Sequence, residues 1–197
     1  MREVELKSAA ARPEQLVAQL LAAGAKPTFS GKLTDRRYDT ADRALSAKDL
    51  VLRLRVYDGD AGTRAGLDWK GPTAYEDGYK VREEVTTDVA DPVSMARVLG
   101  EMGYEVIREI DREIAQYLLV GAVVRIEYYP RMDVLVEIEG APEAIEAAIV
   151  ATGLPRDGFS TERLPDFVRK FEARTGERAA ICARELSGDY RYSATDA

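Results

Sequence analysis

Charged and apolar residues alternate along six segments of this 197-residue sequence, and this pattern limits the possible folds more than any other feature. The segments are residues 2–8, 50–57, 64–70, 78–88, 121–129 and 132–139. A period of two is typical of β-strands, because successive side chains point to opposite faces of a sheet. In residues 50–57, for example, Arg53 and Arg55 share one face, and Leu52 and Leu54 share the other. Each segment therefore predicts a strand with one charged and one apolar face.

The rest of the chain supplies further strands and helices. Residues 32–40 and about 104–118 bring the number of predicted strands to about eight. Helical patterns occupy about residues 12–24, 91–102, 141–153 and 161–174. The strand connections are short, so the sheet should be mostly antiparallel. We therefore expect one α+β domain, with residues 176–197 as a tail or a loosely docked element.

Two arrangements fit the charged faces. An antiparallel sheet often has one solvated face, but such faces usually include Thr, Ser and Gln, whereas these consist almost entirely of Arg, Lys and Glu. The alternative is a closed barrel whose charged faces point inward and whose apolar faces are covered by helices. A dry, empty lumen of this kind would be costly, but a lumen that holds water, a polyanion and divalent metal ions is reasonable. The residues alone leave both arrangements open.

Composition excludes several classes of function. The sequence has no histidine, which rules out Ser-His-Asp and Cys-His catalysis and leaves only oxygen-ligated metals. Its single cysteine, Cys182, cannot form an internal disulfide, which agrees with a reducing compartment. A net charge of −7 argues against a nucleic-acid partner. No apolar run approaches the ~20 residues of a membrane span, and the first residues are unlike a signal peptide, so we expect a cytoplasmic protein with no membrane partner.

Six short motifs follow one another along the chain. They are Glu3-Val4-Glu5-Leu6-Lys7, Arg37-Tyr38-Asp39-Thr40, Leu52-Arg53-Leu54-Arg55, Trp69-Lys70-Gly71-Pro72, Arg82-Glu83-Glu84 and Val136-Glu137-Ile138-Glu139. In this order they resemble the motifs of the CYTH domain, or triphosphate tunnel metalloenzymes, a family that includes class IV adenylyl cyclases and thiamine and inorganic triphosphatases. The resemblance covers about residues 1–175. It implies an eight-stranded antiparallel closed β-barrel, a tunnel with a charged lumen, flanked by helices and binding a triphosphate and a divalent metal.

The resemblance also implies roles for the charged residues, with Mg²⁺ or Mn²⁺ as the cofactor. The implied metal ligands are Glu3, Glu5, Glu84, Glu127, Glu137 and Glu139. The implied triphosphate-binding cations are Lys7, Arg53, Arg55, Lys70, Arg82, Arg112 and Arg125. The implied catalytic residues are Glu3, Glu5, Lys7 and Lys70.

One strand departs from the family pattern. In the strand predicted at about residues 104–118, the family often has a K-x-R pair. In this sequence Arg112 stands at the first position of the pair, and Ile114 stands at the second. Arg112 matches the first cation of the pair. The second is missing, or is supplied by Arg108 on the same face or by Arg125 on the next strand.

Three functions remain in competition. The first choice is a divalent-metal-dependent triphosphatase that hydrolyses tripolyphosphate, thiamine triphosphate or a nucleoside triphosphate. The alternative is a class IV adenylyl cyclase that converts ATP to cyclic AMP and pyrophosphate. The third is a non-catalytic receptor for polyphosphate or nucleotide, which the intact set of metal-type carboxylates disfavours. The expected partner is a small-molecule triphosphate, and a homodimer is left open.

Overall fold

Nine strands and five α-helices form within residues 2–190, the part of the chain that the computed structural model describes. The strands are β1 (Arg2–Ala9), β2 (Lys26–Thr40), β3 (Val51–Gly59), β4 (Gly62–Lys70), β5 (Ala74–Glu76), β6 (Tyr79–Val89), β7 (Tyr104–Leu119), β8 (Ala122–Tyr128) and β9 (Leu135–Glu139). The helices are α1 (Pro13–Ala22), α2 (Pro92–Glu101), α3 (Pro142–Thr152), α4 (Leu164–Thr175) and α5 (Ala183–Ser187). Short 3₁₀ turns lie at Ser46–Lys48 and Arg156–Gly158.

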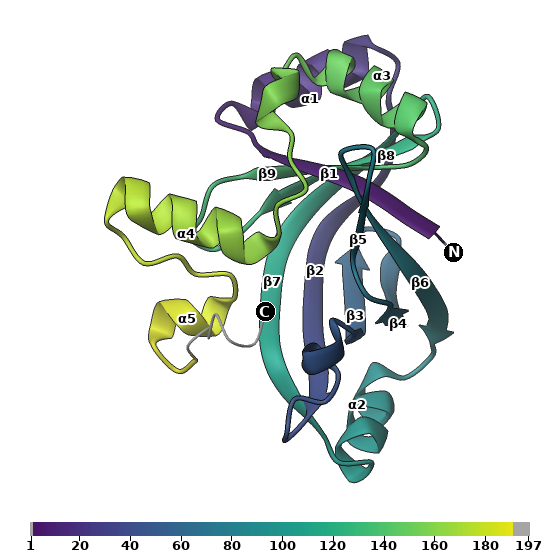
Figure 1. The fold of residues 1–197 in the computed structure, drawn as a ribbon, viewed down its shortest axis with the longest axis vertical. Helices are drawn as coiled ribbons and strands as arrows, with labels where there is room; N and C mark the ends of the chain where they lie inside the picture. Colours follow the sequence, from purple (N-terminus) through teal and green to yellow (C-terminus); the bar gives the residue numbers. More distant parts are fainter. Residues whose placement is uncertain (1, 191–197) are drawn as a thin grey trace.

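Eight of these strands close into an antiparallel barrel (Figure 1). The order is β1-β9-β8-β7-β2-β3-β4-β6, and β1 pairs with β6 to complete the ring. The short strand β5 adds to β6 outside the ring. The predicted α+β fold, an eight-stranded closed barrel flanked by helices, is confirmed.

Local sequence signals set most element boundaries. A proline stands in the first turn of α1, α2, α3 and α4, where its missing N–H costs no helical hydrogen bond. Gly153 and Gly176 end α3 and α4 in the left-handed conformation that favours glycine. The prediction for β2 was too short, because Lys26–Ser30 also pairs with the distal part of β7. That pairing depends on residues far away in the sequence, so no local sequence pattern could predict it.

Helices cover the apolar outer faces of the strands. Under α1 and α3, residues such as Val124, Ile126 and Ile138 are fully buried together with Leu20 and Ile145. Fully burying a side chain of this size contributes about 1.5–3 kcal/mol. The apolar faces therefore point outward into helix contacts, and the charged faces are left for the lumen.

The segment after α4 is docked on the barrel. The backbone of Asp111 donates to Ile181 O at 2.8 Å, and Arg131 and Ala180 exchange backbone hydrogen bonds. Ile181 and Cys182 are almost fully buried. Residues 176–190 are thus a packed element, and residues 191–197 of the predicted tail lie outside the described residues. None of the helices in residues 2–190 is both long and apolar enough to cross a membrane.

Candidate active site

The charged faces of the barrel strands point inward and line a cavity of about 630 Å³. Twelve basic and ten acidic side chains of residues 2–190 line this lumen. It brings together all thirteen residues for which the family resemblance implies a role: Glu3, Glu5, Lys7, Arg53, Arg55, Lys70, Arg82, Glu84, Arg112, Arg125, Glu127, Glu137 and Glu139. Glu5 and Glu137 are only 4% and 6% exposed. An ordinary solvated sheet face is therefore excluded.

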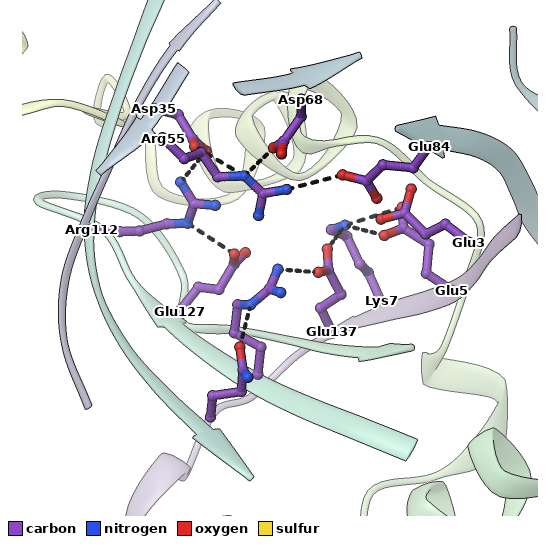
Figure 2. Close-up of polar contacts among 12 residues, drawn as sticks. Glu3, Glu5, Lys7, Asp35, Arg55, Asp68, Glu84, Arg112, Glu127 and Glu137 are labelled. Atoms are coloured by element: carbon purple, nitrogen blue, oxygen red, sulfur yellow. Dashed lines mark hydrogen bonds and ion pairs between the residues drawn. The ribbon is translucent and has the colours of Figure 1, made fainter. Parts of the chain in front are cut away.

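One group of ion pairs, the arginine cluster, consists of Arg53, Arg55 and Arg112 with the carboxylates Asp35, Asp68, Glu84 and Glu127. Figure 2 labels all of these residues except Arg53. Strand register places Asp35 of β2 opposite Arg55 of β3, and Asp68 of β4 opposite Arg53. Asp68 Oδ2 accepts hydrogen bonds from Arg53 Nε at 3.1 Å and from Arg55 Nε. Arg55 Nη2 also donates to Glu84 Oε1 at 3.1 Å. Carboxylates thus occupy the guanidinium donors with which an anion would pair.

Arg112 links β7 to a carboxylate on each side. Its Nη1 donates to Asp35 Oδ2 at 2.7 Å, and its Nε donates to Glu127 Oε1 at 2.9 Å. The Tyr129 hydroxyl donates to the other oxygen of Glu127 at 2.8 Å. Burial alone would raise the pKa of Asp35, but Arg112 and the neighbouring arginines outweigh burial and hold that pKa well below its ordinary value. Glu127 is therefore a hydrogen-bond partner of both Arg112 and Tyr129.

A second group, the lysine cluster, consists of Lys7, Lys70, Lys80 and Arg125 with Glu3, Glu5 and Glu137. Lys70 Nζ lies 2.5 Å from both carboxylate oxygens of Glu3. Lys7 Nζ contacts Glu137 and lies 3.3 Å from Glu5 Oε1, so it bridges two strands (Figure 2). All three glutamates of this cluster are therefore paired with ammonium groups.

Glu137 and Glu139 lie two residues apart on β9 in opposite electrostatic surroundings. Burial alone would raise the pKa of Glu137, but Lys7 and Arg125 outweigh burial and lower that pKa well below its ordinary value. The carboxylate of Glu139 makes no hydrogen bond or ion pair with any described residue. Burial, reinforced by the charges of Glu137 and Glu3, raises the pKa of Glu139 to about 7. The negative charge of Glu139 is therefore poorly compensated by its surroundings.

The chemistry of Glu3, Glu5, Glu137 and Glu139 fits a hard divalent cation. Carboxylate oxygens are the ligands that Mg²⁺ and Mn²⁺ prefer, and a cation beside Glu139 would compensate its negative charge and lower the pKa that burial, Glu137 and Glu3 raise. As the side chains stand, no three Asp, Glu, His or Cys side chains within residues 2–190 converge on a point that could hold a metal ion. Lysines contact three of the four glutamates instead. Metal binding would therefore require these lysines to turn away from the carboxylates.

Two residues lie in surroundings that the sequence did not anticipate. Arg82 lines the lumen, but its Nε donates to Gly71 O at 2.6 Å and its Nη2 donates to the backbone carbonyl of Asp49. These bonds hold the two loops that follow Lys70 and precede β3. Ile114 packs with Leu33 and Tyr57 in a small apolar cluster. Arg108 and Arg125 both line the lumen, so both alternatives for the missing second cation are compatible with the geometry.

Comparison with known proteins identifies the family. A family model described as the CYTH domain matches residues 1–151. The chain belongs to the CYTH family. A candidate adenylate cyclase from Vibrio parahaemolyticus has the same fold, with a TM-score of 0.74 and 19% identity over 85% of this chain and 97% of that chain. A protein from Pyrococcus horikoshii matches with a TM-score of 0.71 and 19% identity over 85% of this chain and 98% of that chain.

A candidate adenylyl cyclase from Hippeastrum, described as having a dominant triphosphatase activity, is a third structural neighbour. Its TM-score is 0.59, with 19% identity over 89% of this chain and 96% of that chain. At these identities the three structures show the CYTH fold alone. No curated protein matches this sequence.

The structure adds lumen residues to which the CYTH motifs gave no role. Asp68 and Lys80 lie on the predicted charged faces, so the alternation pattern placed them correctly without assigning a function. Asp35 is fully buried at the centre of the arginine cluster, and only its place two residues before Arg37 on β2 signalled an inward side chain. Arg163 comes from the start of α4, outside the CYTH match, and no periodic signal pointed to it.

Proposed function

We propose that this protein is a divalent-metal-dependent triphosphatase that hydrolyses an organic or inorganic triphosphate inside the barrel. The observation that carries the proposal is the closed lumen, which contains both the arginine cluster and the carboxylates Glu3, Glu5, Glu137 and Glu139. A triphosphate has roughly four negative charges, and hydrolysis at phosphorus depends mainly on positioning and charge neutralisation. No histidine is needed for this chemistry, which agrees with the composition.

The lumen residues would have different roles in binding and hydrolysis. Arg53, Arg55 and Arg112 would exchange their carboxylate partners for phosphate oxygens, with which a guanidinium makes paired hydrogen bonds. Lys7 and Lys70 would donate to oxygens on which negative charge develops as the phosphorus–oxygen bond breaks. A divalent ion held by Glu3, Glu5, Glu137 and Glu139 would supply further positive charge to the phosphate oxygens.

The lining of the lumen favours hydrolysis over cyclisation of ATP. An adenylyl cyclase must also hold the nucleoside, and an aromatic ring face is a usual platform for a base. Of the described lining residues, Tyr57 and Tyr129 are the aromatic ones, and each ring has an arginine nearby. The guanidinium of Arg64 lies 3.8 Å from the centre of the Tyr57 ring, and that of Arg112 lies 5.8 Å from the centre of the Tyr129 ring. The triphosphatase activity ascribed to the Hippeastrum neighbour agrees with this preference, and the Vibrio neighbour keeps the cyclase as the alternative outcome.

Product analysis tests the proposal. The purified protein is incubated with Mg²⁺ or Mn²⁺ and with ATP, thiamine triphosphate or tripolyphosphate, and the products are separated. We expect release of orthophosphate from at least one substrate and loss of release when EDTA removes the metal. Cyclic AMP with pyrophosphate would establish the cyclase instead, and binding without turnover would establish a receptor.

The Arg53→Lys substitution tests whether the guanidinium of Arg53 binds the phosphate groups. Lysine keeps the positive charge but cannot reproduce the two donors that Arg53 now directs at Asp68 Oδ2, at 3.1 and 3.0 Å. We expect kcat/KM to fall about tenfold or more, which corresponds to one lost charge-assisted hydrogen bond. Arg97→Lys is the control, because that side chain is 82% exposed on α2. Unchanged kcat/KM in Arg53→Lys would remove Arg53 from the phosphate-binding set.

A further inference from the structure

A carboxylate is held at the edge of the lumen by groups that usually bind phosphate. Asp49 follows the 3₁₀ turn Ser46–Lys48 and lines the same cavity as the arginine cluster. Its Oδ2 accepts the backbone N–H of Thr73 at 2.7 Å. The guanidinium of Arg163 straddles the carboxylate, with Nη1 at 3.1 Å from Oδ1 and Nη2 at 3.2 Å from Oδ2. A two-pronged guanidinium and a backbone N–H are also the donors that bind a phosphate group.

The charges at this position favour an anion beyond Asp49 itself. Arg82 Nη2 lies 4.0 Å from Asp49 Oδ1, so two guanidinium groups face one carboxylate. Burial alone would raise the pKa of Asp49, but the Thr73 hydrogen bonds, Arg163 and Arg82 outweigh it and lower that pKa. The carboxylate of Asp49 is therefore ionised near neutral pH. Together with the guanidinium groups of Arg163 and Arg82, it still has a net positive charge.

The backbone at this position is held by hydrogen bonds, whereas the side chains of Asp49 and Arg163 are partly exposed to solvent. Arg82 donates to the backbone carbonyl of Asp49 and to Gly71 O, which holds residue 49 against the loop after Lys70. The side chains of Asp49 and Arg163 are 35% and 37% exposed, so a rotation of the Asp49 side chain into solvent would vacate the donors without moving the loop. Arg163, Leu164 and Pro165 reach the cavity from α4, which lies beside β7 in Figure 1.

The geometry points to a phosphate subsite at the edge of the lumen, formed by Arg163 and the Thr73 N–H, in which the Asp49 carboxylate occupies the place of a phosphate group of the substrate. This inference rests on the proposed function, because it takes the ligand to be a triphosphate that extends from the arginine cluster towards α4. An arriving phosphate group displaces Asp49 and takes over its donors. Asp49 thus competes with the substrate, and Arg163 adds a binding cation from outside the CYTH match.

Binding measurements on four forms of the protein test the subsite. Tripolyphosphate is titrated into wild type, Asp49→Asn, Arg163→Gln and the double variant by calorimetry, in EDTA so that no metal-dependent turnover occurs. Asparagine keeps an oxygen for the Thr73 N–H but removes the competing charge, so Asp49→Asn should bind roughly three- to tenfold more tightly. Arg163→Gln should bind more weakly by a similar factor, both in the wild-type and in the Asp49→Asn background.

The double variant separates substrate binding from a structural role. If Arg163 only neutralised Asp49, Arg163→Gln would have no effect once Asp49 is Asn, and that result would overturn the inference. Arg169→Gln on the same helix is the matched control, because Arg169 pairs with Asp166 and does not line the lumen. Melting curves establish that each variant is folded. Should Asp49→Asn fail to fold, Arg163→Lys should bind with intermediate affinity between wild type and Arg163→Gln, and equal affinities of all three would overturn the inference.

Two further arms identify the ligand and the level at which a failure occurs. The affinity for orthophosphate should differ less than twofold between Arg163→Gln and wild type. Orthophosphate lacks the further phosphate groups by which tripolyphosphate would be anchored in the arginine cluster. An equally large effect with orthophosphate would mean that the subsite binds free phosphate and not part of a triphosphate. If wild type neither binds tripolyphosphate in EDTA nor hydrolyses any of the tested triphosphates with Mg²⁺ or Mn²⁺, the proposed function fails, and the inference fails with it. If wild type binds tripolyphosphate and the Arg163 variants bind equally well, only the inference fails.

Discussion

The Glu139→Gln variant is expected to be more stable than the wild type in the absence of metal, and to lose most of its activity. The pKa of Glu139 is raised from 4.5 to about 7 by burial and by the charges of Glu137 and Glu3. Below pH 4.5 the carboxyl group is protonated in both the folded and the unfolded chain, so its charge does not lower the free energy of unfolding. Between pH 4.5 and 7 the unfolded chain loses its proton first, so folding becomes less favourable, and above pH 7 the penalty is complete.

Glutamine removes this penalty because it has no charge. In EDTA, the unfolding free energy of Glu139→Gln should exceed that of wild type by about 2–3 kcal/mol above pH 7, and by progressively less towards pH 4.5. Turnover with Mg²⁺ or Mn²⁺ should nevertheless fall roughly 10- to 100-fold, because one of the proposed metal ligands is gone. Urea unfolding at several pH values and phosphate-release assays measure the two effects.

Glu137→Gln is the matched control on the same strand. The carboxylate of Glu137 compensates Lys7 and Arg125, so its removal should lower stability where the removal of Glu139 raises it. If Glu139→Gln keeps full activity, Glu139 is no metal ligand. If its stability has the same pH dependence as that of wild type, the poorly compensated charge is located elsewhere.

Alternation alone predicted six of the barrel strands and the charged side chains that share one face of each, because charged and apolar residues occupy opposite faces in all six segments. What it could not supply was closure. A solvated sheet and a closed barrel have the same period of two, and only the pairing of β1 with β6 distinguishes them. That pairing joins residues about 80 positions apart through backbone groups, and the alternation of side chains does not reveal which backbones pair. The family resemblance decided between the two where the pattern did not.

Partners within the lumen were less predictable than its lining. Arg82 has the same place in the alternation as Lys80, yet it donates to the backbone carbonyls of Gly71 and Asp49, whereas Lys80 contacts the carboxylate of Glu5. The difference arises from the loops that approach the end of β6, and their course depends on the whole fold. Arg163 was missed for a related reason, since α4 reaches the lumen only after the chain has passed around the barrel.

The Arg112→Gln substitution is expected to cause the largest loss of stability. Arg112 is 7% exposed, and its partners Asp35 and Glu127 are 0% and 2% exposed. Removing the cation leaves two buried carboxylates without the guanidinium that bonds to both. Breaking a buried pair in this way costs about 3–5 kcal/mol, and urea unfolding at pH 7 measures the loss. Activity should fall as well, because Arg112 is one of the residues that we propose to bind phosphate.

A second substitution shows whether the loss comes from the buried charge of Asp35. In the Arg112→Gln/Asp35→Asn variant the carboxylate that lost its partner is neutral, so stability should return part of the way towards wild type. The pH dependence provides an independent check, because the folded protein holds the pKa of Asp35 below its ordinary value of 3.8. The stability that Arg112 contributes through Asp35 is therefore complete above about pH 4 and is lost as the pH falls through the folded-state pKa. The gap in unfolding free energy between wild type and Arg112→Gln should accordingly narrow in acid, and a gap that stays constant down to pH 2, with no rescue by Asp35→Asn, would show that Arg112 stabilises the barrel by packing and not by its charge.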